Sequence, residues 1–180
     1  MKPKVTMRRA LSDDGLLGRA LPGDSWLAWR ILLIAIMGEE LTDDERTIFR
    51  NLTGRDHEPG FPVEEFWAVI GRRGGKTRAA ATLSCYLSAL CRWRLVPGER
   101  GKMVYAAATQ RQAALALGYA RALLHGGPML KGIVSGESQM ALELRNGIDL
   151  EVRAASFRSI RGITSIAAVV DEIAFLQTSE

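Results

Sequence analysis

The residues that could do chemistry together lie in one glycine-rich stretch, GRRGGKT, at positions 71–77. Three glycines let its backbone turn tightly and point N–H groups at an anion, namely Gly71, Gly74 and Gly75. The stretch ends in Lys76, whose ammonium can neutralise the β- and γ-phosphates of a nucleotide, and Thr77, whose hydroxyl can hold Mg²⁺. This pattern predicts a phosphate-binding loop.

The chain on either side of the loop fits this interpretation. Residues 66–70, FWAVI, have the aromatic and β-branched content of a buried strand, and the sequence from Thr77 onward is rich in helix formers. The loop is one residue shorter than the standard pattern GxxxxGK followed by Ser or Thr, whose first glycine would fall at Ile70. A structural turn before a helix that begins with lysine is the alternative. The order strand, loop, helix favours nucleotide binding.

Two neighbouring carboxylates, Asp171 and Glu172, follow a second apolar run at 165–170. In a parallel nucleotide-binding sheet the ligand lies beyond the carboxyl ends of the strands, so this strand would bring both acids to the phosphates. Asp171 is then expected to bind Mg²⁺, directly or through water, and Glu172 to act as the base that activates a water. The alternative is the exposed first turn of a helix. Combined with the loop, the pair indicates an ATP hydrolase, because a kinase needs no water-activating glutamate.

The elements that must position these residues begin with two helices. The first is expected from Asp24 to about Met37. Thr42 and Glu45 form a capping-box pattern that would open the second, which ends near Leu52. Both helices precede the first expected strand of the sheet.

Beyond the loop helix, the chain alternates between strand and helix. MVYAAA at 103–108 is expected to be a strand, and Thr109 to cap the helix that follows. Apolar residues alternate on both sides of Asn146 and Gly147, which predicts an antiparallel hairpin. The order of elements predicts an α/β fold with a mainly parallel sheet and helices on both faces, a three-layer α/β/α arrangement to which the hairpin is added.

Length and composition indicate one domain. The 180 residues are 47% hydrophobic, enough for a single core; residues 1–20 are expected to be a flexible lead outside it, and residues 21–180 to form the domain. The net charge of +4 permits DNA binding and is equally explained by an ordinary surface. Cys85 and Cys91 lack a metal-ligand spacing and are expected to be reduced thiols. No apolar segment reaches the roughly 20 residues that span a bilayer and no signal peptide is visible, so a cytoplasmic protein without a membrane partner is expected.

Taken together, these motifs resemble the N-terminal ATPase region of a terminase large subunit, the DNA-packaging motor of bacteriophages and prophages. The shortened loop GRRGGKT is similar to that family's variant Walker A, and VVDEIAF to its Walker B. LPGDSWLAWR and FRNLTGR are similar to the segment before the loop, so the resemblance runs from about Leu21 to the end of the chain. It implies a P-loop NTPase fold, with ATP as substrate and Mg²⁺ as cofactor.

The resemblance also implies roles for individual side chains. It gives the loop lysine and threonine and the two acids the roles stated above. Arg72 matches an arginine that stabilises charge on the transferring phosphate from within the same subunit; Arg73 lies beside it in the phosphate loop, and an arginine from a neighbouring subunit is a further alternative. FRNLTGR places Phe49 and Arg55 where related ATPases hold the nucleotide, although Phe49 is better explained as a core residue and Arg55 is equally well explained as a surface residue.

Three more arginines have two open interpretations each. Arg111 lies where helicase-like ATPases contact the nucleic-acid backbone, and Arg158 and Arg161 lie where packaging ATPases contact DNA or the triphosphate. Each is also explained as part of an ordinary solvated surface.

The function implied by the resemblance is translocation of viral double-stranded DNA into a capsid. The motor would act as a homo-oligomeric ring in the cytoplasm of the bacterial host, with a portal protein and a small terminase subunit as partners. The resemblance further implies that the coupling strand, which inserts between the loop strand and the Asp-Glu strand, and the nuclease domain lie outside this chain. The expected fold is therefore incomplete at the C-terminus, with an unfilled slot in its sheet. The alternatives are a helicase-like, nucleic-acid-dependent ATPase and a non-enzymatic prophage remnant.

Overall fold

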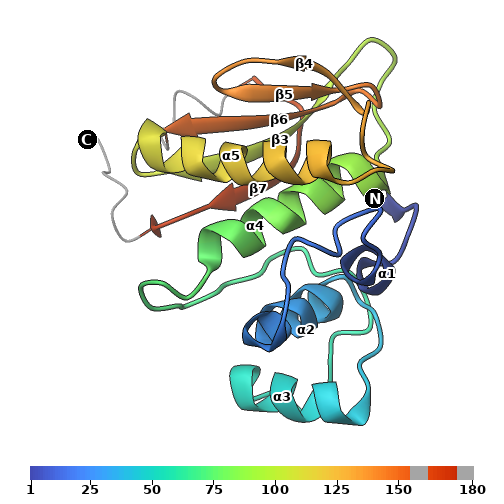
Figure 1. The fold of residues 1–180 in the computed structure, drawn as a ribbon, viewed down its shortest axis with the longest axis vertical. Helices are drawn as coiled ribbons and strands as arrows, with labels where there is room; N and C mark the ends of the chain where they lie inside the picture. The colour runs from blue at the N-terminus through green and yellow to red at the C-terminus, as the bar shows by residue number, and fades with distance from the viewer. Residues whose placement is uncertain (155–161, 174–180) are drawn as a thin grey trace.

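The computed structural model describes residues 1–154 and 162–173, which form an α/β fold with a five-stranded mixed sheet (Figure 1). The helices are α1 (Met7–Ser12), the short η1 (Asp24–Trp26), α2 (Leu27–Ile36), α3 (Asp43–Thr53), α4 (Lys76–Cys85), its π-helical continuation η2 (Tyr86–Leu90) and α5 (Gln110–Gly126). The strands are β1 (Lys2–Pro3), β2 (Cys91–Arg92), β3 (Gly101–Ala107), β4 (Val134–Glu137), β5 (Ala141–Leu144), β6 (Ile148–Ala154) and β7 (Ser165–Val170). Strands β1 and β2 form a separate antiparallel pair.

The sheet has the order β4-β5-β6-β3-β7, with β3 parallel to both β6 and β7 and with β4, β5 and β6 antiparallel. The predicted strand at 103–108 and the hairpin of β5 and β6 are confirmed, with Gly147 at φ 84° in its turn. The prediction of a mainly parallel sheet is right only for the side formed by β6, β3 and β7. Strand β4, of sequence VSGE, was missing from that prediction because it has no alternation of apolar and polar residues.

One face of the sheet packs against α5, as the alternation of side chains requires. Met103 and Tyr105 of β3 and Leu150 and Val152 of β6 are almost fully buried on this side. The inner surface of α5 has three alanines, so the helix lies close to the strands, and α4 packs against α5 in turn (Figure 1); the buried residues of α5 are Ala113, Ala116, Leu117, Ala120 and Leu124.

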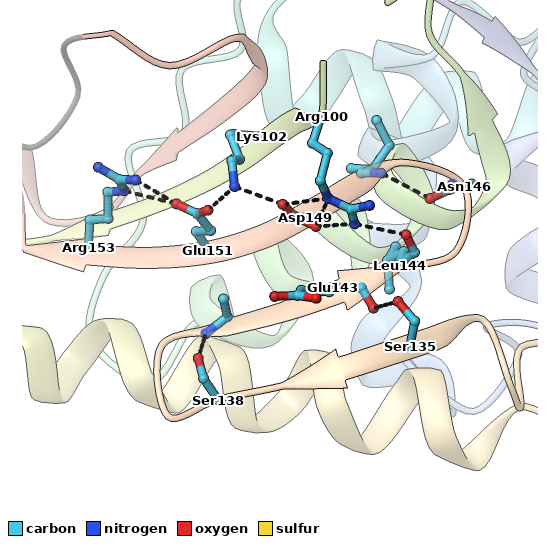
Figure 2. Close-up of polar contacts among 12 residues, drawn as sticks. Arg100, Lys102, Ser135, Ser138, Glu143, Leu144, Asn146, Asp149, Glu151 and Arg153 are labelled. Atoms are coloured by element: carbon cyan, nitrogen blue, oxygen red, sulfur yellow. Dashed lines mark hydrogen bonds and ion pairs between the residues drawn. The ribbon is translucent and has the colours of Figure 1, made fainter. Parts of the chain in front are cut away.

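The other face of β3 and β6 has a row of alternating charges (Figure 2). Lys102 Nζ lies 2.7 Å from Asp149 Oδ2 and 2.5 Å from Glu151 Oε1, with Arg100 paired to Asp149 and Arg153 to Glu151 at the two ends. Burial alone would raise the pKa values of Asp149 and Glu151, but the hydrogen bonds from the cations outweigh it and hold both pKa values below their usual range. Because a slip of one residue would move these acids into the core, the row helps to fix the register of the parallel pair.

The prediction that residues 66–70 form a buried strand is wrong. The segment joins no strand, and Trp67 is 73% exposed and Val69 fully exposed. Its composition is typical of a strand, but a strand needs a neighbour to accept its backbone hydrogen bonds. Strand β7 instead forms the edge of the sheet, pairing only with β3 among the described strands.

The N-terminal 20 residues are part of the core, contrary to the prediction of a lead outside it. Met7 and Ala10 of α1 are fully buried, as is Ala20. The backbone N–H of Lys4 donates to the carbonyl oxygen of Leu90 at 2.8 Å, next to the β1–β2 pair. The segment was misjudged because a helix of six residues has too few apolar positions to show a period.

The helices before the loop follow their sequence signals. The expected helix from Asp24 is present as η1 and α2, and α3 begins with the predicted capping box, in which Thr42 and Glu45 bond reciprocally. Phe49 is only 3% exposed, which confirms the core interpretation. Cys85 and Cys91 are buried free thiols, as expected. Within the described ranges, every helix is too short or too polar to cross a bilayer.

Candidate functional site

The phosphate-loop candidate has the predicted loop-to-helix geometry. Residues 72–75 form a turn and a bend, and α4 begins at Lys76 with Gly75 as its N-cap at φ 78°. A Cβ at Gly74 would lie 2.3 Å from Ile70 Cγ2, and one at Gly75 would lie 2.6 Å from Trp26 Cζ3. Both distances are shorter than a van der Waals contact, so the backbone here has the tight approach that only glycine permits.

The cations of the loop have no ion-pair partner in the part of the chain that the structure describes. Arg72 and Arg73 are exposed, Lys76 and Thr77 are half-buried in the first turn of α4, and Arg73 has a left-handed backbone at φ 62°. None of the described residues forms an ion pair with Arg72, Arg73 or Lys76. The first turn of α4 also has no acidic residue. The positive end of this helix and its lysine are therefore free to attract an anion.

A buried tyrosine holds the first of the two acids. The Tyr105 hydroxyl donates to Asp171 Oδ2 at 2.7 Å, and the Asp171 N–H extends the β3–β7 pairing by donating to the Ala106 carbonyl at 2.8 Å. Burial raises the pKa of Tyr105, the hydrogen bond to Asp171 raises it further, and a hydrogen bond with Thr77 acts in the opposite direction. Asp171 therefore bonds this hydroxyl directly, and Thr77, far away in the sequence, lies close enough to influence its pKa.

The second acid is held by the start of α5. Gln112 Nε2 donates to Glu172 Oε2 at 2.6 Å, and Gln112 Oε1 accepts the backbone N–H of Thr109 at 3.1 Å in the capping box of this helix. Glu172 has φ 55°, a left-handed conformation that is uncommon outside glycine and costs about 1 kcal/mol or more. The carboxylate is half-buried and turned toward α5 by this contact.

Several predicted residues lie away from this group or outside the described residues. Arg55 is exposed, and its backbone N–H bonds to Thr53 Oγ1 at 3.2 Å. Arg111 lines an open groove of about 700 Å³ together with Arg121, Glu137 and Met140. Arg158 and Arg161 lie outside the described residues.

Sequence reasoning missed four side chains of the site. Tyr105 carries the one polar side chain in the apolar run 103–108, and a buried hydroxyl needs a partner, which is a signal that was available. Gln112 follows Thr109 at capping-box spacing, but this pattern does not predict that it also contacts an acid. Trp26 and Trp29 lie against the loop, with Trp29 Nε1 donating to the Gly74 carbonyl at 2.8 Å. That contact is between distant segments, and no local pattern indicates it.

Two side-chain oxygens near the loop could bind a magnesium ion whose remaining ligands are waters and the phosphates of a bound nucleotide. Thr77 supplies a hydroxyl and Asp171 a carboxylate, both of which are hard oxygen ligands. Among the described residues no cluster of three or more His, Cys, Asp or Glu side chains could hold a metal by itself. Two protein oxygens fit Mg²⁺, which usually keeps several waters and binds substrate phosphates.

Comparisons of the chain with protein-family models, with curated proteins and with solved structures gave no match. The similarity to terminases therefore remains a resemblance of short motifs. The arguments available for function are the free cations of the loop, the two acids and the side chains that bring them together.

Proposed function

We propose that this chain is a P-loop ATPase domain, the ATP-hydrolysing motor domain of a terminase large subunit. The observation that carries the proposal is the hydrogen bond from the Tyr105 hydroxyl to Asp171, which holds this acid at the end of β7 with Thr77 nearby. In P-loop ATPases a threonine at the start of the loop helix and an acid at the end of a neighbouring strand share one magnesium ion. The hydrogen bond of Tyr105 supports this assignment because it orients Asp171, and the effect of Thr77 on the same hydroxyl indicates that the two residues are close.

The loop would bind the triphosphate. The N–H groups at its helix end and the Lys76 ammonium would neutralise the β- and γ-phosphates, with Gly71, Gly74 and Gly75 allowing the close approach. Arg72 is exposed and unpaired among the described residues, as a group that stabilises charge on the transferring phosphate should be before ligand binds. Mg²⁺ bound by Thr77 and Asp171 would offset the negative charge that the phosphate oxygens develop.

Glu172 would accept a proton from the attacking water. Its carboxylate is held by Gln112 at 2.6 Å, so a water that replaces this contact would reach the same oxygen. Asp171 and Glu172 are adjacent in sequence but bond different partners, Tyr105 and Gln112. The two acids can therefore have different roles, Asp171 as a ligand of Mg²⁺ and Glu172 as the base.

The wider role proposed for the motor is packaging of double-stranded DNA, in a ring of subunits with a portal protein and a small terminase subunit. This part is supported by the loop GRRGGKT, the strand end VVDEIAF and the segments before the loop. A net charge of +4 is compatible with contact to DNA.

The test is ATP binding and phosphate release by the purified chain with Mg²⁺. Lys76→Ala is expected to abolish binding, because it removes the cation at the β- and γ-phosphates. Glu172→Gln is expected to retain binding and to lose at least about a hundredfold in turnover, because it removes the base. The matched controls are Lys131→Ala and Glu64→Gln, which make the same changes at exposed positions and should behave as the wild type.

Turnover that survives in Lys76→Ala, or a wild-type chain that binds no nucleotide, would contradict the ATPase assignment. Binding without turnover in the wild type would support the loop and exclude hydrolysis by the isolated chain. Turnover stimulated by single-stranded rather than double-stranded DNA would favour a helicase-like ATPase over a packaging motor.

A further inference from the structure

The Gly74–Gly75 peptide of the loop is held by an indole from a distant part of the chain. Trp29 Nε1 donates to the carbonyl oxygen of Gly74 at 2.8 Å. Trp26 lies three residues before Trp29, so the two rings lie on the same side of this helical segment. A Cβ at Gly75 would lie 2.6 Å from Trp26 Cζ3 and 3.3 Å from Trp29 Nε1. Both rings therefore lie directly against the loop backbone.

Holding one end of a peptide orients the other end. The Gly74 carbonyl and the Gly75 N–H belong to one planar trans peptide and point in opposite directions. Because Trp29 holds the carbonyl toward α2, the Gly75 N–H points away from α2. None of the described residues accepts this N–H. It is left free for an acceptor from outside the protein.

The Gly74–Gly75 peptide needs a contact from outside the loop to fix its orientation, because the backbone torsions on both sides of it belong to glycines. A peptide between two glycines can exchange orientations at little steric cost. The start of α4 is attached to the same N-terminal segment, since Arg78 Nε donates to the Ala20 carbonyl at 2.6 Å and its guanidinium lies 5.2 Å from the centre of the Trp26 ring. The segment from Ala20 to Trp29 thus contacts the loop and the first turn of its helix together.

We propose that Trp29 is a positioning residue of the phosphate loop. Its indole N–H keeps the Gly74–Gly75 peptide in the orientation that presents the Gly75 N–H to a phosphate. That the anion is a nucleotide phosphate rests on the proposed ATPase function; the orientation of the peptide does not. Trp29 acts only through the loop backbone.

Trp29→Phe tests the proposal, because it removes the N–H and keeps an aromatic ring at a half-buried position. Trp93→Phe is the matched control: Trp93 Nε1 also donates to a backbone carbonyl, that of Leu87 at 2.9 Å, outside the loop. In the ligand-free protein, ¹⁵N relaxation dispersion of the Gly75 amide reports reorientation on the microsecond to millisecond timescale. Exchange at Gly75 is expected in Trp29→Phe and not in Trp93→Phe or the wild type.

Calorimetric titration with MgADP supplies the second measurement. Affinity is expected to fall about three- to tenfold in Trp29→Phe and to be unchanged in Trp93→Phe, as the loss of one oriented hydrogen bond predicts. A Gly75 amide that behaves alike in the wild type and Trp29→Phe would overturn the proposal, whatever the affinity. If the wild type binds no MgADP but Gly75 exchanges only in Trp29→Phe, the ATPase function fails and the positioning role stands.

Discussion

At the scale of single residues, the candidate site depends on polar atoms buried among apolar ones. Tyr105 is 1% exposed, yet its hydroxyl has a carboxylate partner in Asp171. A second buried tyrosine, Tyr86, donates its hydroxyl to the Val5 carbonyl at 2.7 Å on the N-terminal segment. The two hydroxyls are alike in burial and differ in partner, so their removal separates a role at the site from a role in folding.

Tyr105→Phe is expected to weaken Mg²⁺-dependent nucleotide binding by about tenfold, because Asp171 loses the donor that orients it. Its free energy of unfolding should change little, since the half-buried Asp171 can be hydrated. Tyr86→Phe should do the opposite: it leaves a backbone carbonyl unpaired, at a cost of about 1 kcal/mol, and spares binding. Titration of MgADP and denaturant unfolding of both variants measure this. Equal effects of the two substitutions on binding would refute a role for Tyr105 at the site.

At the scale of elements, α3 is fixed by charges at its N-terminus. Arg46 donates from Nε and Nη2 to the two carboxylate oxygens of Glu58 at 2.9 and 2.8 Å, and Glu58 also accepts the Leu41 N–H at 2.8 Å. The hydrogen bond from Arg46 is the largest cause that lowers the pKa of Glu58, to about 2. The loop after α3 is thereby attached to the start of the helix.

This contact predicts a specific dependence of stability on pH. The folded-state pKa of Glu58 lies below the unfolded value, so its contribution is complete above about pH 4.5 and is lost as the pH falls toward about 2. Glu58→Gln should therefore be less stable than the wild type at pH 6, with the difference shrinking between about pH 4.5 and 2. Denaturant unfolding across this range measures it, with the exposed Glu64→Gln as control. A difference that stays constant with pH would contradict this role.

Which elements could be predicted from the sequence depends on how local their causes are. The capping box at Thr42, the N-cap at Thr109, the turn at Gly147 and the start of α4 at Lys76 follow from short patterns, and all are present. Residues 66–70 have strand composition but no strand beside them, so local preference gave the wrong result. The contacts that build the site, such as Gln112 with Glu172, join segments that only the folded chain brings together.

At the scale of the whole molecule, the described part of the sheet ends at strand β7. Strand β7 pairs on one side only among the described strands, and Val170 is 40% exposed. Residues 66–70, which come before the phosphate loop, also expose apolar side chains: Trp67 is 73% exposed and Val69 is 103% exposed. An unpaired edge and exposed apolar side chains both favour association between copies.

The wild-type chain is therefore expected to associate in a concentration-dependent way, and Val69→Lys to reduce this association by placing a charge in the exposed apolar segment. Val96→Lys is the control, because Val96 is 63% exposed in a different part of the chain. Sedimentation velocity over a roughly hundredfold range of concentration measures both. A wild-type chain that stays monomeric throughout, or equal effects of the two lysines, would show that this segment does not drive association.

The placement of the indoles makes the loop visible to optical spectroscopy. The chain has four tryptophans, and two of them, Trp26 and Trp29, lie against the loop. Trp67 is mostly exposed, so an added quencher can suppress its emission selectively, while Trp93 is bonded elsewhere. An anion that enters the loop changes the electric field at the first two rings. The intrinsic fluorescence of the unlabelled protein should therefore report the occupancy of the loop in real time.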